Sequence, residues 1–82
     1  MKATKHPEMV KTRLYAAVAN EVRTRRESAQ MTQADLAKAL GTSHATINKL
    51  ESGDQAPALH VLVSLADHFD CTLDDLVPVL TD

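Results

Sequence analysis

Hydrogen-bonding side chains are concentrated in one short segment of the chain. Residues 33–52 read QADLAKALGTSHATINKLES, and His44, Asn48 and Lys49 recur there at a spacing that places them on one face of a helix. No acidic residue lies between Ser43 and Lys49. An α-helix fits the major groove of DNA, where imidazole, amide and ammonium groups exchange hydrogen bonds with base edges. These residue types therefore favour recognition of a polar ligand.

Two other groups of residues have side chains of the types found in metal sites and in catalytic sites. His60, His68 and Cys71 are metal-binding types, and the last two have the H-x-x-C spacing. Zinc needs four ligands, and no second compact pair of Cys or His exists, so we expect no metal and no cofactor. The chain has no nucleophile elbow, phosphate-binding loop or zincin motif. We interpret Asp74 and Asp75 as carboxylates at a helix start and expect no enzymatic activity.

The composition restricts the fold that can position these residues. With 82 residues, 44% of them hydrophobic, the chain is expected to form one small globular domain. Two Gly and three Pro are few turn residues, which favours helices over a β-rich fold. One cysteine excludes an intramolecular disulfide, and no stretch resembles a signal peptide or a membrane span. We therefore expect a cytoplasmic protein that has no membrane partner.

The formal net charge of −2 hides an uneven distribution. Residues 1–26 carry seven Lys and Arg against two Glu, whereas residues 27–82 carry two Lys against nine acidic residues. A mildly acidic net charge argues against nucleic-acid binding only if the charges are spread evenly along the chain. The split favours one face for a polyanion and another for a different partner, although simple solvation of two surfaces explains it equally well.

Capping and helix-breaking residues divide the chain into five predicted helices. Thr32 and Asp35 have the spacing of a capping box, in which each side chain accepts a backbone hydrogen bond, and Thr72 and Asp75 repeat it. A break of the first helix near Thr12 is an alternative. The predicted bounds are Pro7 to about residue 29, Thr32 to Gly41, Ser43 to Gly53, a fourth helix after Pro57, and a fifth from Thr72 that Pro78 interrupts.

Apolar residues recur at helical spacing in these segments and define the expected core. Ala37 is small where the second and third helices are expected to approach most closely, and Leu59 and Val63 are expected to widen the apolar face of the fourth. The other predicted core positions are Val10, Leu14, Ala17, Val18, Val22, Leu36, Leu40, Ile47, Leu50, Leu62, Leu65, Ala66 and Phe69.

From about residue 17 to residue 77 the chain resembles the Cro/cI-type (Xre-type) helix-turn-helix DNA-binding proteins. The resemblance rests on TQADLAKALGTS, on INKLESG, on the Pro57 that follows, and on LVSLADHFDCTLDDL. It implies an all-α, five-helix lambda-repressor-like bundle in which the second and third helices form the helix-turn-helix. Residues 1–16 would be a basic N-terminal extension, partly helical or flexible, and residues 17–82 the DNA-binding domain with a C-terminal dimerisation helix.

The resemblance also implies functions for single residues. Gln33 matches a position at which the family holds a phosphate and braces the recognition helix. Thr42 and Ser52 match positions that contact the flanking DNA backbone. Arg26 and Glu51 match an internal ion pair between the first helix and the end of the third. The base- and phosphate-reading face of the third helix corresponds to Ser43, His44, Ala45, Thr46, Asn48 and Lys49.

Three features depart from the family pattern. Gln30 stands where the family often has Gly, at a cost of about 1 kcal/mol if the position needs a positive φ. Asp70 and Cys71 replace a usual Gly-Val turn before the fifth helix. The reading face has no Arg, so a bidentate contact with guanine would have to come from Lys49, while Asn48 could pair with adenine.

Together these observations predict a sequence-specific, double-stranded DNA-binding transcriptional regulator, with repression or autoregulation as the default. We expect a homodimer on a palindromic operator, because two recognition helices multiply the affinity of one. One alternative is an antitoxin-type protein whose acidic C-terminal half binds a protein partner, and another is an interaction module that binds no DNA. The expected dimer interface is the apolar set Leu73, Leu76, Val77, Val79 and Leu80, and the alternative is the N-terminal set Met9, Val10, Leu14 and Tyr15.

Overall fold

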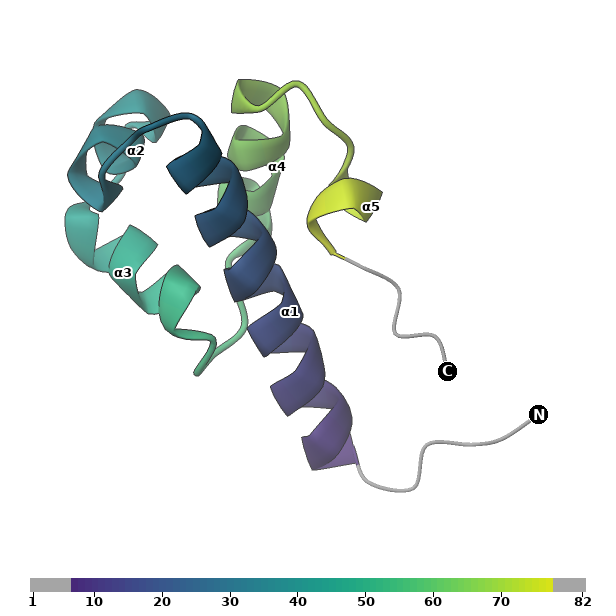
Figure 1. The fold of residues 1–82 in the computed structure, drawn as a ribbon. Helices are drawn as coiled ribbons and strands as arrows, with labels where there is room; N and C mark the ends of the chain where they lie inside the picture. The colour runs from purple at the N-terminus through teal and green to yellow at the C-terminus, as the bar shows by residue number, and fades with distance from the viewer. Residues whose placement is uncertain (1–6, 78–82) are drawn as a thin grey trace.

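The computed structural model describes residues 7–77 of the chain, with side chains from Val10 onward. Five helices follow one another in it: α1 (Pro7–Ser28), α2 (Gln33–Leu40), α3 (His44–Ser52), α4 (Leu59–His68) and α5 (Leu73–Leu76) (Figure 1). Residues 7–77 contain no strand. The predicted all-α fold with five helices is therefore confirmed.

Side-chain caps begin α2, α3 and α5 at the predicted residues. Thr32 Oγ1 accepts a hydrogen bond from the backbone N–H of Asp35 at 3.0 Å, and the Asp35 carboxylate accepts one from the Thr32 N–H at 3.0 Å. Thr72 and Asp75 form the same reciprocal pair, at 3.2 and 3.0 Å. Ser43 Oγ accepts from the third N–H of α3 at 3.1 Å. Each cap satisfies an N–H group that a helix start leaves without an intrahelical partner.

Two glycines end α2 and α3 in the left-handed conformation, with φ of 69° at Gly41 and 74° at Gly53. A Cβ added to Gly41 would meet nothing within 4 Å, whereas one added to Gly53 would lie 3.3 Å from the Cα of Ala16 in α1. Gly41 is therefore needed for the turn alone. Gly53 is needed for both its turn and the close approach of the chain to α1.

Two residues other than glycine also have positive φ, and both belong to the predicted departures. Gln30, between α1 and α2, has φ of 58°, and Asp70, between α4 and α5, has φ of 53°. The left-handed conformation costs about 1–2 kcal/mol for a residue with a Cβ, and Asp tolerates it better than Gln. Gln30 therefore has the positive φ that the glycine of the family pattern would adopt without strain.

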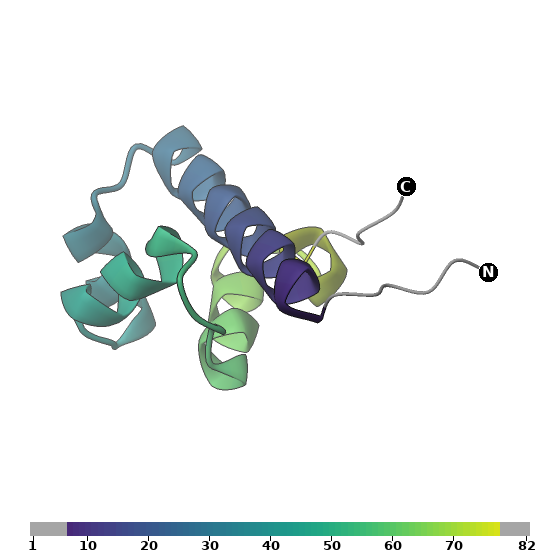
Figure 2. The same ribbon diagram turned by 90° about the horizontal axis from the view of Figure 1, so that it is seen from below.

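The longest helix, α1, runs through its 22 residues without a break. This corresponds to about 33 Å at 1.5 Å per residue, and the alternative of a break near Thr12 is excluded. Leu14, Val18 and Val22 recur every four residues, and the last two are fully buried. Figures 1 and 2 show that the first turns of α1 project beyond the other helices.

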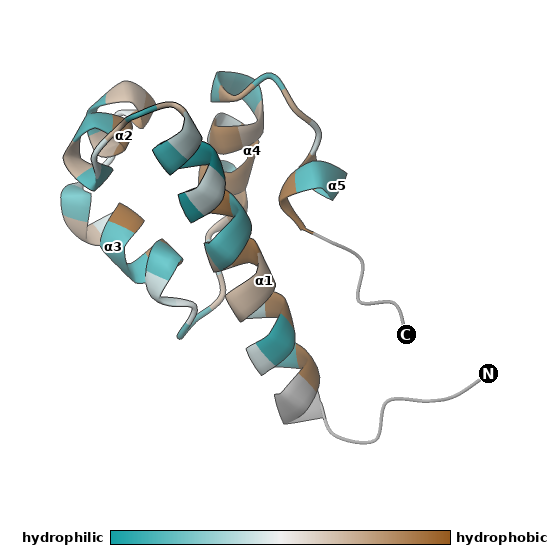
Figure 3. Cartoon of the chain, viewed as in Figure 1, coloured by the Kyte–Doolittle hydropathy of each residue, from teal (hydrophilic) through white to brown (hydrophobic). Residues whose placement is uncertain are grey.

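The core lies where α1, α2, α3 and α4 meet, and α5 closes one side of it. α2 packs against α3 and α4, α1 against α3 and α5, and α4 against α5. The apolar faces that these contacts bury appear in brown on the inner sides of the helices in Figure 3. The buried cluster consists of Val18, Val22, Leu36, Ala37, Ile47, Leu50, Val61, Leu62, Leu65, Ala66 and Leu76.

Two predicted core residues of α4 are wrong. Leu59 and Val63 are 69% and 50% exposed, while Val61, which was not predicted, is buried. The larger contacts of α4 are with α2 and α5, and the face that carries Val61, Leu62, Leu65 and Ala66 belongs to the core cluster. Leu59 and Val63 form a neighbouring ridge, four residues apart, that no other helix covers.

The short α5 contributes one residue to the core. Leu76 is fully buried, Val77 is half-buried against the core, and Leu73 is 38% exposed. Val79 and Leu80, two members of the expected dimer interface, lie outside the described residues. Within residues 7–77 no helix combines the length and apolar character that crossing a membrane requires.

Candidate nucleic-acid interface

One face of α3 is exposed and the opposite face belongs to the core. Ile47 and Leu50 are buried, and the Glu51 between α3 and α1 is buried as well. The residues of α3 that are exposed to solvent are His44, Ala45, Asn48, Lys49 and Ser52. All the exposed members of the predicted reading face in α3 therefore share one surface, and no acidic side chain interrupts it from His44 to Lys49.

Hydroxyl groups lie at both ends of this surface. The Ser43 Oγ that caps α3 is also 2.9 Å from the hydroxyl of Thr46, and Thr46 is half-buried. Thr42, in the turn before α3, is half-buried too. At the other end, Ser52 Oγ donates a hydrogen bond to the carbonyl of Lys49 at 2.6 Å. The structure thus places the predicted backbone-contacting residues on either side of the reading face.

An ion pair between α1 and α3 lies directly behind this surface. Arg26 Nε donates to Glu51 Oε2 at 2.7 Å and Arg26 Nη2 donates to Glu51 Oε1 at 2.9 Å, while Nη1 donates to the carbonyl of Met31 at 2.8 Å. The side chains are only 12% and 3% exposed, respectively. The hydrogen bond to Glu51 raises the pKa of Arg26 above its ordinary value. A planar guanidinium matches a carboxylate in this two-bond geometry.

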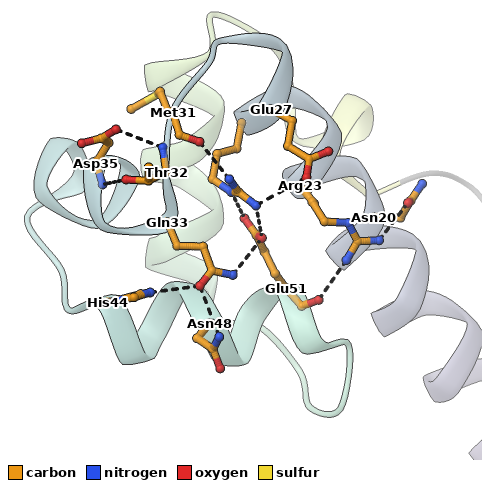
Figure 4. Close-up of polar contacts among 11 residues, drawn as sticks. Asn20, Arg23, Glu27, Met31, Thr32, Gln33, Asp35, His44, Asn48 and Glu51 are labelled. Carbon is orange, nitrogen blue, oxygen red and sulfur yellow. Dashed lines mark hydrogen bonds and ion pairs between the residues drawn. The ribbon is translucent and has the colours of Figure 1, made fainter.

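Gln33, the first residue of α2, connects this ion pair to the exposed face of α3 (Figure 4). Its Nε2 donates a hydrogen bond to Glu51 Oε1 at 3.1 Å. Its Oε1 accepts one from Asn48 Nδ2 at 3.2 Å and lies 3.0 Å from His44 Nε2. Side chains of α1, α2 and α3 therefore form one hydrogen-bonded network from Arg26 and the buried Glu51 to the surface residues His44 and Asn48.

Two further arginines near the end of α1 have acceptors within the protein. Arg23 Nη1 donates to the backbone carbonyl of Glu51 at 3.4 Å, and Nη2 donates to Asn20 Oδ1 at 3.1 Å. Arg25 Nε donates to Glu21 Oε2 at 2.9 Å, one helical turn away. Arg23 thus gives the end of α3 a second contact with α1.

Most exposed acidic side chains of the second half of the chain lie in or beside α4 and α5. Figures 1 and 2 place α5 on the side of α1 and α4 that is remote from α2 and α3. The residues concerned are Asp67, Asp70, Asp74 and Asp75. The acidic residues of α5 therefore lie on the side of the molecule remote from α2 and α3.

The residues considered for a metal site do not come together. Among the residues that the structure describes, no group of three His, Cys, Asp or Glu side chains is arranged to hold a metal ion. His68 packs its ring edge-on against Phe69, with 5.0 Å between the centroids, and Cys71 is half-buried against the core.

The family resemblance implies the ion pair and the bracing role of Gln33 as two separate features. The structure joins them through the two ends of the Gln33 amide. A signal for this link was present in the sequence: His44, Asn48 and Glu51 follow the spacing i, i+4, i+7 and so share one stripe of α3. What the sequence does not contain is the place of Gln33 opposite that stripe.

A short capped helix, a tight glycine turn and a second helix with one exposed polar face together define a helix-turn-helix domain. Comparison with known proteins agrees, since the helix-turn-helix family HTH_3 matches residues 22–76, more than half of the chain. The chain therefore belongs to this Cro/cI-type helix-turn-helix family.

One solved structure supports the fold. The chain is similar to the crystal structure of an HTH_3 family transcriptional regulator from Vibrio cholerae, with a TM-score of 0.72 and 20% sequence identity over 80% of this chain. The chain spans 37% of the length of that regulator. No curated protein matches the sequence.

Proposed function

We propose that this protein binds a specific double-stranded DNA sequence by placing α3 in the major groove. The observation that carries the proposal is the exposed face of α3, which presents an imidazole, an amide and an ammonium group and no carboxylate. The N-terminal residues of a recognition helix reach base edges in this arrangement. Regulation of transcription would follow from occupying an operator in the cytoplasm, with repression or autoregulation as the default outcome.

The residues of the interface divide into two functions. Asn48 and Lys49 would contact base edges, and Ala45 would contact a thymine methyl group. Hydroxyl and amide groups at the margins would hold phosphates and set the register of the helix on the duplex. These margin residues are Gln33, Thr42, Ser43, Thr46 and Ser52. His44 lies beside both groups and could contact either a base edge or a phosphate.

The charge of the interface supports binding that depends on base contacts. Lys49 is the one cation among the described residues of α3, and Lys38 is the one cation of α2. Few phosphate-neutralising cations release few counterions, so non-specific DNA affinity should be modest and only weakly dependent on salt. Two copies of α3 on a palindrome, about 34 Å apart, would supply the remaining affinity.

A homodimer is part of the proposal, with α5 at the expected interface. Leu73 is partly exposed there, whereas the Leu76 side chain already fills the core of its own chain and would support the interface from below. The N-terminal half of α1, which carries the half-buried Leu14 and Tyr15, is the alternative. Sedimentation at micromolar concentration tests the dimer, and a stable monomer that binds a palindrome tightly would exclude it.

Selection of genomic DNA fragments by the whole protein tests DNA binding. Enrichment of a symmetric half-site is expected, and no enrichment at low salt would refute the proposal. On the selected site, Lys49→Ala should weaken binding by about 1–3 kcal/mol and should weaken binding to random DNA less. Lys38→Ala is a matched control, because it removes the same exposed charge near the C-terminal end of α2. Equal losses of Lys49→Ala on both DNAs would limit Lys49 to phosphate contact.

A protein partner on the acidic surface is a second candidate function, as in an antitoxin-type protein. The four exposed Asp residues of α4, α5 and the turn between them favour a basic partner on the side remote from α3. Neutralising these residues as Asn should abolish co-purification of such a partner and leave DNA binding intact. Co-purification that survives their neutralisation would exclude this surface.

A further inference from the structure

The orientation of the Gln33 side chain is fixed by its buried neighbour. Glu51 Oε1, 3.1 Å from one end of the Gln33 amide, belongs to a carboxylate whose two oxygens both accept hydrogen bonds from Arg26. A carboxylate only accepts hydrogen bonds, so the amide end that faces it must be the NH2 group. The opposite orientation would place two oxygen atoms 3.1 Å apart beside the buried Glu51 side chain, which is 3% exposed.

This orientation determines what the surface residues must do. Gln33 Oε1 points toward α3 and can only accept hydrogen bonds. Asn48, 3.2 Å away, must therefore present its NH2 group to Gln33, and His44 must carry a hydrogen on the Nε2 that lies 3.0 Å away. As Figure 4 shows, the Asn48 oxygen then points away from Gln33, and in the neutral His44 ring Nδ1 is left as an acceptor.

We infer that the Glu51 carboxylate, acting through Gln33, sets the hydrogen-bonding polarity of the recognition helix and makes Asn48 a reader of adenine. The inference rests on the proposed function. The outward Asn48 oxygen needs a donor, which only adenine and cytosine present in the major groove. One hydrogen of Asn48 Nδ2 remains after the bond to Gln33, and adenine N7 accepts it while the adenine amino group donates to Oδ1. Guanine and thymine present acceptors at the corresponding oxygen atoms and are disfavoured.

Gln33 is thereby a positioning residue for specificity, distinct from a residue that merely holds a phosphate. A phosphate contact changes the affinity for every sequence by the same factor, because phosphates carry no sequence information. An orienting contact changes the ratio between sequences. If Gln33 were absent, the Asn48 amide could rotate by half a turn and offer its NH2 group to guanine or thymine instead.

The test measures the affinity of the whole protein for the selected operator and for operators in which each base pair is replaced in turn. For the wild type, one half-site position should prefer adenine by roughly 10- to 100-fold, and this preference should disappear in Asn48→Ala. Gln33→Met keeps the length of the side chain and removes its amide, so the preference should fall to about 3-fold or less. Gln33→Met added to Asn48→Ala should change it no further.

Two other variants separate orientation from folding and from general surface effects. Glu51→Gln offers Gln33 an amide that can either donate or accept, so the adenine preference should relax although Gln33 is intact. Because the preference is a ratio measured on one preparation, any unfolded fraction cancels. Gln55→Met removes a matched amide from the exposed loop after α3, outside the network, and should leave the preference unchanged.

Several results would overturn the inference while leaving the proposed function standing. They are a uniform loss for Gln33→Met with an unchanged preference, an Asn48-dependent position that prefers guanine or thymine, and a Glu51→Gln variant as selective as the wild type. A wild-type protein that selects no site at all would instead refute the proposed function itself.

Discussion

Replacing Arg26 with Met tests how strongly the fold depends on the ion pair behind α3. The substitution deletes three hydrogen bonds of the guanidinium, two to the Glu51 carboxylate and one to the Met31 carbonyl. The remaining Glu51 side chain is 3% exposed and keeps Gln33 as its side-chain donor. Removing one partner of a buried ion pair costs about 3–5 kcal/mol, because the other charge stays buried without compensation.

The size of this loss can be compared with the total stability of the domain. At about 0.05–0.15 kcal/mol per residue, the 82-residue chain is expected to unfold with a free energy of roughly 4–12 kcal/mol. The substitution would remove a quarter of that at the least and all of it at the most. Since 1 kcal/mol shifts the thermal midpoint by about 4–8 °C in a domain of this size, Tm should fall by at least about 12 °C.

Arg25 provides a matched control one residue earlier in α1. Its Nε lies 2.9 Å from Glu21 Oε2, close to the Arg26–Glu51 distance of 2.7 Å, but both side chains are 30% exposed. An exposed pair one helical turn apart contributes about 0.3–0.5 kcal/mol. Arg25→Met should therefore cost about 0.5 kcal/mol, although it makes the same chemical change in the same helix.

Urea unfolding followed by circular dichroism measures these differences. The double variant Arg26→Met/Glu51→Met replaces both charges by apolar side chains and should recover more than half of the loss. Equal losses for Arg26→Met and Arg25→Met would refute the argument that burial, and not distance, gives the pair its importance. A double variant as unstable as the sum of its two single variants would refute it as well.

Three further predictions concern turns and caps. Gly41→Ala should lower the free energy of unfolding by about 1–2 kcal/mol. Gly53→Ala should lower it more, because the added Cβ would also press on α1. Equal losses of the two variants in denaturant unfolding would contradict this. Gln30→Gly should stabilise the protein by up to about 1 kcal/mol in the same assay, because it relieves a φ of 58°, and a loss would show that the residue is not strained. A backbone hydrogen bond from the N-cap residue holds the pKa of Asp35 and of Asp75 below the usual range. These two carboxylates therefore stabilise the folded protein fully above the ordinary carboxyl pKa. That stabilisation is lost as the pH falls through the lowered pKa. Tm should therefore drop below about pH 4 less steeply in Asp35→Asn/Asp75→Asn than in the wild type, and parallel profiles would exclude the caps as the cause.

The helix boundaries could be predicted because they depend on chemistry within three or four residues. A Thr or Ser hydroxyl reaches only the N–H groups of its own first turn, and a left-handed residue ends a helix wherever it stands. Gln30 and Asp70 followed the same local logic although neither is glycine. The rotation of α4 could not be predicted in this way, because its apolar residues are numerous enough to form a wider face than the neighbouring helices cover. Whether Leu59 or Val61 is buried is decided by those neighbours.

At the candidate site, the sequence predicted the participants and not their connections. Resemblance to the family placed Arg26 opposite Glu51, and Gln33 at the start of the second helix. The hydrogen bonds between Gln33, Asn48 and Glu51 join residues 15 and 18 positions apart, so they depend on how closely the start of α2 approaches the middle of α3. That approach is set by packing at Ala37 and Ile47, both buried, and by the turn at Gly41.

The network also accounts for how an acidic chain can present a surface to a polyanion. Glu51 is the acidic residue of α3, and both of its carboxylate oxygens accept hydrogen bonds from Arg26 while its side chain is shielded from solvent. Arg26 therefore compensates the charge of Glu51 behind the reading face, and the carboxylate is not exposed there. With few exposed cations on α2 and α3, attraction to phosphates adds little to affinity for a particular site. In the proposed complex, the base contacts of His44, Asn48 and Lys49 would supply the discrimination, and the buried Glu51, through Gln33, would orient the first two.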